Sequence, residues 1–385
     1  MTRARGILII VGAVIVACAF AAAAALLQDA GRRMGTALEG ETAAPVERAG
    51  VFTSAWSMRF QPAVISDMAL MPARAGEFLA LGNDKMHRFD SFGRRVALVE
   101  APSKSSRIAT DPTGAMPHIL VVSRKTKWTG AIDHVVTTDH YLHALDSAGR
   151  PVWTKRFDPK DASTLEPQVA TLGSRRVVLL SASRHIICFD VSGDQLWTLP
   201  LWHHPGTLTV TKAADGRGML LAAAAPKKSI VQITASGTVG GTWGMGDGPD
   251  RFRVITAAGR VAGISVRQVF RRGPGVRHAV AFFGGDGTLL DETELPPDSS
   301  LPAYDQIVAM DVDGSGRPRW VLTLSDGTVM VFSLRGEELA RDALGVRVRS
   351  VLALPQASGP DLLVTGTHTG ISAWLPVPGR LRIRE

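Results

Sequence analysis

Histidines and aspartates come closest together between residues 133 and 143. Five of them occupy eleven positions: Asp133, His134, Asp139, His140 and His143. Imidazole nitrogens and carboxylate oxygens are the ligands of zinc sites. However, residues 135–138 are all β-branched and predict a strand, so Asp139-His140 is expected to form a hairpin turn. The turn would send His140 and His143 to opposite faces of the following strand. We therefore favour a polar turn here over a zinc site.

Other motifs that could carry chemistry are weak. His203-His204 are adjacent, and adjacent side chains rarely chelate one metal ion well. The glycine-rich Gly244-Met-Gly-Asp-Gly248 does not lie between a strand and a helix, so it does not predict a phosphate-binding loop. The chain has only two cysteines, Cys18 and Cys188, which are too few for a disulfide framework or a cysteine zinc site. The sequence also lacks a Gly-x-Ser-x-Gly elbow and a His-Glu-x-x-His helix. These observations favour a protein that is not an enzyme.

A short turn recurs along the chain and sets the architecture. Its copies share a hydrophobic residue followed by small or polar residues and a glycine, at Phe89–Gly93, Leu145–Gly149, Phe189–Gly193, Ile233–Gly237, Phe283–Gly287 and Phe332–Gly336, with a looser seventh copy at Trp374–Gly379. The final glycines are 43 to 56 residues apart. A period of 40–50 residues built of strands and turns is typical of a β-propeller.

The clearest unit covers residues 304–341 and predicts four short strands joined by glycine turns, which is one blade. Seven such units predict an all-β, seven-bladed β-propeller over residues 51–385. A propeller must close its ring or leave a sheet edge exposed. The alternating segment 51–60 is therefore expected to supply the outer strand of the last blade. The longest repeats contain insertions at Lys125–His134 and Arg271–Arg277, which we expect to be loops.

The repeats resemble two known families. Asp311-Val-Asp-Gly-Ser-Gly-Arg-Pro318, followed by Asp326-Gly-Thr-Val329, resembles the FG-GAP/VCBS repeat of integrin-like propellers. Ala144–Trp153 and Phe189–Trp197 resemble the PQQ-like (quinoprotein-type) repeat, whose tryptophan docks between blades. The resemblance covers residues 60–380, and its motifs specify a blade better than they specify a chemistry.

The first resemblance implies calcium in an Asp-x-Asp-x-Asp-Gly-x-x-Asp loop, where oxygens at alternate positions wrap a hard cation. Asp311, Asp313 and Ser315 match part of that loop, but Arg319 stands where the last aspartate is expected. We favour a turn in which aspartates accept hydrogen bonds from the backbone, with calcium as the alternative. The second resemblance implies a quinone only in its enzyme members. Because the chain has no adjacent cysteines, we expect no cofactor.

The N-terminus has the pattern of an export segment. Arg3 and Arg5 precede an apolar run, Ile7–Leu27, that is long enough to span a bilayer as a helix. We expect residues 1–28 to be an uncleaved signal anchor and residues 29–50 a linker. The alternatives are a cleaved signal peptide of a secreted protein and a lipoprotein acylated at Cys18. All three place the rest of the chain outside the cytoplasm, in the periplasm or the extracellular space, as in a membrane-anchored or exported bacterial protein.

The net charge of +8 is modest for 385 residues, and the arginines are scattered. Nucleic-acid binding would need a dense basic stripe with interleaved aromatic residues, so we expect no nucleic-acid partner. The sequence predicts a non-enzymatic scaffold at the cell envelope that binds a protein or a glycan. The expected contact residues lie in the two insertions: Lys125, Lys127, Trp128, Arg271 and Arg272. The alternatives are an exported enzyme (a quinone-dependent dehydrogenase, a lyase or a hydrolase) and a factor that assists outer-membrane protein assembly.

Overall fold

The structure is a computed structural model, and it describes residues 50–381 apart from short internal segments at 60–63, 72–75, 83, 103, 112–118, 130–134, 158–164, 173, 183, 202–207, 213–217, 225–228, 245–248, 258–259, 273–274 and 296–306. The expected anchor and nearly all of the expected linker therefore lie outside the described residues. Among the residues described, none forms a helix long and apolar enough to cross a membrane.

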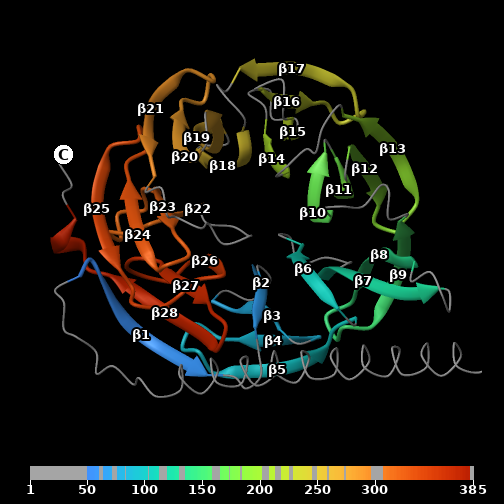
Figure 1. The fold of residues 1–385 in the computed structure, drawn as a ribbon, viewed down its shortest axis with the longest axis horizontal. Helices are drawn as coiled ribbons and strands as arrows, with labels where there is room; N and C mark the ends of the chain where they lie inside the picture. The colour runs from blue at the N-terminus through green and yellow to red at the C-terminus, as the bar shows by residue number, and fades with distance from the viewer. Residues whose placement is uncertain are drawn as a thin grey trace, which may run out of the picture. The chain divides into compact units, whose positions relative to one another are not determined.

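The described residues form seven antiparallel sheets of four strands each, arranged in a ring (Figure 1). The first sheet contains β2 (Ile65–Leu70), β3 (Phe78–Gly82), β4 (Lys85–Phe89) and β5 (Arg95–Glu100). The second contains β6 (Ser105–Thr110), β7 (Ile119–Thr129), β8 (Val135–Leu145) and β9 (Pro151–Phe157). The third contains β10 (Leu165–Leu172), β11 (Arg175–Ala182), β12 (His185–Asp190) and β13 (Gln195–Pro200).

The next sheet contains β14 (Leu208–Lys212), β15 (Gly218–Ala224), β16 (Ser229–Ile233) and β17 (Val239–Gly244). It is followed by the sheet of β18 (Pro249–Ala257), β19 (Arg260–Arg272), β20 (Gly275–Phe283) and β21 (Leu289–Glu294). The sixth sheet contains β22 (Ile307–Met310), β23 (Arg319–Thr323), β24 (Thr328–Phe332) and β25 (Glu338–Ala343). The last contains β26 (Ser350–Leu354), β27 (Leu362–Gly366), β28 (Gly370–Pro376) and β1 (Phe52–Arg59), and η2 (Pro378–Arg380) follows it.

Burial follows the order of the strands within each sheet. The middle strands β3 and β27 are buried at every residue, whereas the outer strands β5 and β13 alternate between exposed and half-buried residues. This is the pattern expected when sheets pack face to face around an axis and only the rim meets water. Buried apolar side chains therefore lie between neighbouring sheets and hold the ring together.

The recurring turn connects the third and fourth strands of a sheet. In the copy at Asp190, one carboxylate oxygen accepts hydrogen bonds from the backbone N–H groups of Ser192 and Asp194, each at 2.9 Å. Gly193 donates to the carbonyl of Asp190 and has a φ of +92°, a conformation that residues with a Cβ rarely adopt. Asp90 and Asp146 form the same network in their turns.

Tryptophans on outer strands join neighbouring sheets at these turns. The indole N–H of Trp153 donates to the carbonyl of Val191 at 2.9 Å, and its ring lies against Gly193. The indole N–H of Trp56, on β1, donates to the carbonyl of Ser91 at 2.9 Å and covers Gly93 in the same way. Trp197 and Trp243 cover the equivalent glycines at positions 237 and 287.

The last sheet is completed from the other end of the described chain. β1 pairs antiparallel with β28 from Phe52, opposite Pro376, to Arg59, opposite Gly370. This is the place that the alternating pattern of segment 51–60 predicts for it. The backbone N–H of Phe52 also donates to the carboxylate of Asp342 at 2.9 Å. Asp342 lies on β25, so β1 contacts the preceding sheet as well as its own.

The expectation of a seventh turn at Trp374–Gly379 is wrong. β28 continues to Pro376, and Pro378–Arg380 form a 3-10 helix in place of the glycine turn. The reason is topological: β1 supplies the fourth strand of this sheet, so β28 has no following strand to which a hairpin turn would lead.

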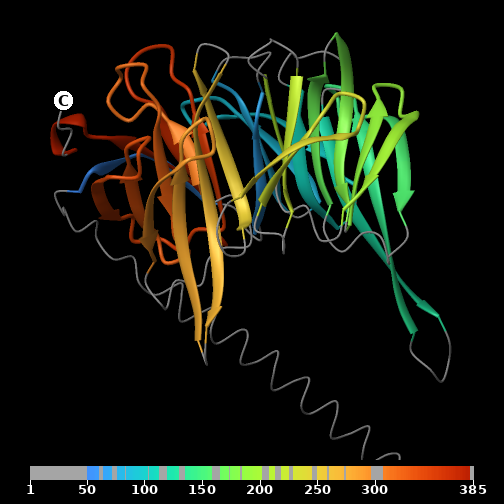
Figure 2. The same ribbon diagram turned by 90° about the horizontal axis from the view of Figure 1, so that it is seen from above.

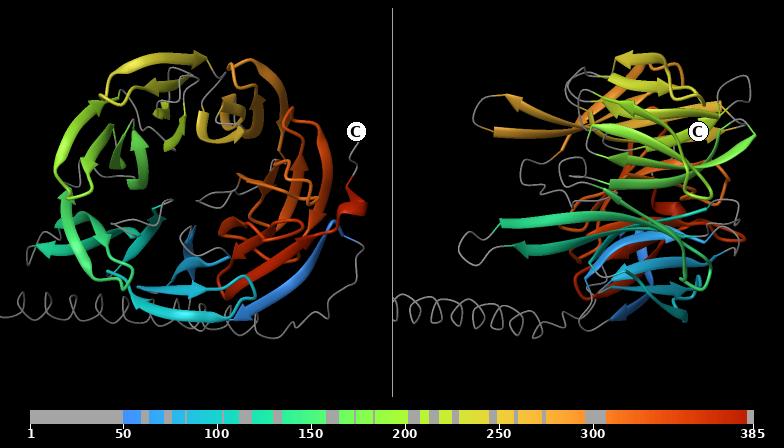
Figure 3. Two further views of the ribbon diagram at one scale, coloured as in Figure 1. Left: turned by 180° about the vertical axis from the view of Figure 1, so that it is seen from behind. Right: turned by 90° about the vertical axis from the view of Figure 1, so that its right-hand side faces the viewer.

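Two hairpins are much longer than the others, and they project from the same face of the ring (Figures 2 and 3). They are formed by β7 with β8 and by β19 with β20, and each pair contains the second and third strands of its sheet. Connections between the second and third strands lie at the same face in every antiparallel blade, which explains why both hairpins point the same way. The insertions were expected to be loops, but their described residues, 125–129, 271–272 and 275–277, lie in strands.

Candidate functional site

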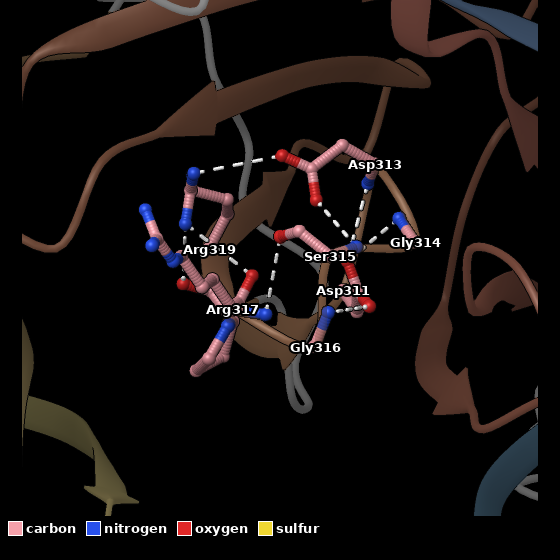
Figure 4. A network of polar contacts seen from close by, with 8 residues as sticks. Asp311, Asp313, Gly314, Ser315, Gly316, Arg317 and Arg319 are labelled. Carbon is pink, nitrogen blue, oxygen red and sulfur yellow. Dashed lines mark hydrogen bonds and ion pairs between the residues drawn. The ribbon is translucent and has the colours of Figure 1, made fainter. Parts of the chain in front are cut away.

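The loop Asp311–Arg317, for which the sequence favours a tied turn and leaves calcium as the alternative, is a compact hydrogen-bonded turn (Figure 4). Asp311 accepts hydrogen bonds from the backbone N–H groups of Asp313 at 3.2 Å, Gly314 at 2.9 Å and Gly316 at 2.6 Å. Asp313 accepts from the N–H of Ser315 at 3.0 Å. Both carboxylates therefore already bind the backbone of their own loop.

The charges around this loop oppose a second role as a cation site. A guanidinium nitrogen of Arg319 lies 3.6 Å from a carboxylate oxygen of Asp313. Burial acts to raise the pKa of Asp313, but hydrogen bonds from Ser315 and the charge of Arg319 outweigh it and lower the pKa overall. Arg319 thus occupies the side of the loop where a further acidic ligand would be needed. The geometry fits a tied turn better than a calcium site, and calcium binding stays a prediction.

Among the described residues, the histidines and aspartates of the second sheet form no metal-binding group. β8 runs without interruption from Val135 to Leu145, so the hairpin turn expected at Asp139-His140 is wrong. Asp139 binds Arg156 at 2.8 Å, whereas His143 lies between the hydroxyls of Ser123 and Thr154. Burial lowers the pKa of His143. Within the described part of the chain, no group of three or more histidines, cysteines or acids is placed to hold a metal ion.

Several candidate residues cannot be placed. Asp133, His134, His203 and His204 lie outside the described residues, as do most positions of the segment 244–248. The expected contact residues Lys125, Lys127 and Trp128 lie on β7, and Arg271 and Arg272 lie on β19. The structure thus brings the two insertions to one face but places them on different sheets of the ring (Figure 2).

A polar cavity that the sequence analysis missed opens among the innermost strands of the ring. Its volume is about 180 Å³, and β2, β6, β10, β14 and β18 contribute its lining. Arg107 is 8% exposed and donates to Glu166 at 2.7 Å, and its guanidinium also lies 3.9 Å from Asp67. The three charged side chains come from three different sheets, so they link neighbouring sheets at the centre of the ring.

The electrostatics of Asp67 favour a structural role. Burial raises its pKa, although the charge of Arg107 and backbone hydrogen bonds act in the opposite direction. Its two oxygens accept hydrogen bonds from the backbone N–H groups of Met68 and Ile108, both at 3.0 Å. A charged residue inside a strand that the repeat predicts to be innermost is a sequence signal for each of these residues, but it does not tell which of them meet.

No protein-family model matches the chain, and no curated protein matches it. Among solved structures the chain is similar to BamB from Moraxella catarrhalis, with 14% identity and a TM-score of 0.49 over 84% of this chain and 97% of that chain. It is also similar to BBS1N, solved in complex with ARL6DN, with 9% identity and a TM-score of 0.54 over 85% of this chain and 98% of that chain. At such identities a likeness shows the fold alone. Together with the ring of four-stranded sheets, it confirms the prediction of an all-β propeller.

Proposed function

We propose that this chain is a seven-bladed β-propeller held at the cell envelope, outside the cytoplasm, where it acts as a non-enzymatic scaffold for a protein partner. The partner binds the face from which the two long hairpins project. The N-terminal apolar run Ile7–Leu27 supports the location, because it has the length and composition of a signal anchor. The seven sheets supply the blades, one sheet for each unit of the repeat.

The observation that carries the proposal is the shared direction of the two hairpins. Among the described residues, two of the seven sheets have much longer second and third strands than the rest, with 11 residues each in β7 and β8 and 13 and 9 in β19 and β20. Both extend from one face (Figure 3). Extra length on a rigid repeat scaffold is where binding residues usually lie. Two projections on one face suit a single partner that contacts both.

The buried charges at the centre of the ring give weaker support to the enzyme alternative. Acids from different sheets do converge there, as a catalytic site in a propeller would require. However, Arg107 binds Glu166, and both oxygens of Asp67 accept hydrogen bonds from the backbone. We therefore assign this network to the stability of the ring.

Site-specific photo-crosslinking in intact cells tests the proposed face. The crosslinker is placed at Trp128 and at Arg271 on the hairpins, and at Leu98 and Leu290 as matched controls on exposed positions of outer strands. We expect the hairpin positions to capture one common protein that the rim positions do not capture. Capture of a glycan would change the class of partner, and equal capture from the rim, or none from either hairpin, would contradict the proposal.

A further inference from the structure

Among the rim turns, the turn of the first sheet carries a large apolar side chain where the others do not. The residue before the turn glycine is Phe92 in this sheet. In the other five copies the residue at this position is small or charged: Ala148, Ser192, Ser236, Asp286 and Arg335. Phe92 is 72% exposed, and its backbone N–H donates to Asp90 at 3.0 Å. The turn therefore fixes the backbone of a phenylalanine whose side chain meets the surroundings.

The strand that follows, β5, continues this apolar character along the outer edge of the ring (Figure 1). Val96 and Leu98 lie two positions apart and therefore share one face of β5, where they are 46% and 45% exposed. Arg94 and Arg95 stand between them and Phe92 in the sequence, and both are exposed. We name residues 92–98 the β5 rim segment. Single exposed apolar side chains are ordinary, but several together mark contact with a protein or a membrane.

The charges of the β5 rim segment suit a surface of lipid phosphates. The guanidinium of Arg94 lies 5.6 Å from the centroid of the Phe92 ring, and its Nε donates to Asp90 at 2.7 Å. Asp90 therefore offsets the charge of Arg94, whereas Arg95 adds an exposed positive charge. At a bilayer surface, apolar side chains enter the boundary of the acyl chains and arginines remain among the phosphates. Phe92 and Arg95 can supply these two contacts.

The fifth sheet offers a comparison with similar exposure and opposite charge. Leu289 and Leu290, on β21, are 54% and 44% exposed. Asp291 and Glu292 follow them directly and are also exposed, and residues 284–294 contain no lysine or arginine. The β5 rim segment, in contrast, contains two arginines and no acid. An anionic surface would attract the first sheet and repel the fifth, whereas a contact driven by apolar area alone would accept both.

The place of the β5 rim segment suits contact with the membrane that the expected anchor enters. The indole N–H of Trp56, on β1, donates to the carbonyl of Ser91 in the same turn. Gly50 precedes Trp56 by six residues, so at most about 21 Å of chain separates the end of the expected linker from this contact. A tethered surface needs only weak affinity, because the linker keeps it near the bilayer at an effective concentration on the order of millimolar.

We propose that the β5 rim segment rests on the surface of the anionic bilayer that contains the anchor, with Phe92 at the boundary of the acyl chains and Arg95 among the phosphates. The inference rests on the proposed location at the cell envelope and adds how the propeller is oriented there. The ring stands on its rim, so the two long hairpins, which project along the axis of the ring, are directed along the bilayer (Figures 1 and 2). Their face stays open to a protein partner.

The test uses the full chain reconstituted in vesicles of phosphatidylcholine and phosphatidylglycerol in equal parts. A phospholipid with a diazirine near the top of one acyl chain is activated by light, and mass spectrometry locates the attached lipid. The apolar run Ile7–Leu27 is the internal standard. We expect at least about tenfold more lipid on residues 92–98 than on Leu289 and Leu290, because the local charges differ in sign. In vesicles of phosphatidylcholine alone this difference should shrink.

Two variants separate the apolar contact from the charge. Phe92→Ser, which copies the residue of the turns at Ser192 and Ser236, should lower the attachment about tenfold in both kinds of vesicle. Arg95→Gln should lower it about fivefold in the mixed vesicles and leave it unchanged in phosphatidylcholine. Both side chains are exposed, so an unchanged melting temperature serves as the control for folding. Undiminished attachment in either variant would overturn the role of that residue.

Three results would overturn the inference as a whole. Lipid on the internal standard but none on residues 92–98 would exclude the contact and leave the proposed function standing, whereas lipid on neither would contradict the proposed location as well. Equal attachment on residues 92–98 and on Leu289 and Leu290 would show that charge does not select this side of the ring. A photo-crosslinker at Phe92 that captures a protein in intact cells would show a protein at this surface in place of the bilayer.

Discussion

The rim of the ring and the face with the hairpins differ in how closely they follow the sequence repeat. At the rim the same device recurs: a turn whose glycine has a positive φ, covered by a side chain from the outer strand of the preceding sheet. At the face, two of the seven sheets depart from the repeat by extending their second and third strands. The repeated turns thus join neighbouring sheets at the rim, whereas the departures at the face are where we propose that the partner binds.

The rim itself contains two kinds of junction. At Gly193 and Gly237 the covering side chain is a tryptophan that also donates a hydrogen bond to the turn. At Gly149 the covering side chain is Val99, which has no polar hydrogen to donate. The difference shows that close contact with the glycine is the common requirement and that the hydrogen bond adds to it.

The largest effect is expected when a methyl group is added to a rim glycine. The Gly193→Ala variant combines a φ of +92° with overlap against the Trp153 ring. We expect a loss of about 2–4 kcal/mol in the free energy of unfolding. The control is Gly345→Ala, where φ is +70° and nothing lies within 4 Å of the added carbon. That variant should lose only about 1 kcal/mol. Urea unfolding followed by circular dichroism measures both, and equal losses would contradict close packing at the rim.

The next effect separates the two kinds of junction. We expect Trp153→Ala to lose about 2–3 kcal/mol, because it removes a large contact and a hydrogen bond. Val99→Ala should lose about 1 kcal/mol, because it removes only two methyl groups at the equivalent place. A loss at Val99 as large as that at Trp153 would show that the tryptophan adds nothing specific to the junction.

Cys188 offers a second measurement of the same comparison. Its side chain is fully buried, and burial raises the pKa of its thiol to about 12. In a background with Cys18→Ser, a maleimide at pH 8 should therefore label Cys188 only when the sheet opens or unfolds. Labelling should be faster in Trp153→Ala than in Val99→Ala. Fast labelling of Cys188 at pH 8 in the protein without rim substitutions would contradict the burial of this side chain.

A smaller effect is expected from acid. Hydrogen bonds, first from the side chain of Ser192 and then from the backbone, lower the pKa of Asp190. A carboxyl whose pKa is lower in the folded state stabilises the fold above its unfolded pKa and loses that contribution as the pH falls through the folded value. In Asp190→Asn, whose carbonyl can still accept the backbone hydrogen bonds, stability should fall less between pH 5 and pH 2 than in the parent. If the free energy of unfolding fell equally with pH in the parent and in Asp190→Asn, the lowered pKa of Asp190 would be contradicted.

Much of the architecture could be predicted from the sequence, because each sheet corresponds to one copy of the repeat. The turns at Phe89–Gly93 and Phe189–Gly193 give the period, and strand composition gives the sheets between them. Two expectations failed for reasons of topology. The copy at Trp374–Gly379 has the residues of a turn but no fourth strand to lead to, and the pair Asp139-His140 lies within a strand that extends beyond its sheet.

The polar cavity shows what sequence patterns could not supply. Asp67, Arg107 and Glu166 follow one another along the chain at intervals of 40 and 59 residues, and each looks like an ordinary charge in a strand. They meet because each lies on the innermost strand of a different sheet. Such a contact depends on the position of a strand within its sheet and on the side of the strand that faces the axis, and no local signal reports both.

Shortening both hairpins in one chain should have the smallest effect on stability. It is also the most direct test of the proposal that the partner binds the face with the hairpins. Residues 125–139 are replaced by an Asn-Gly turn that joins the cross-strand pair Arg124 and His140. Residues 270–277 are replaced by an Asn-Gly turn that joins the cross-strand pair Val269 and His278. We expect the melting temperature to change little, because the removed segments lie outside the four-stranded sheets, and capture of the partner to be lost. Undiminished capture would contradict the account, whatever happens to the melting temperature.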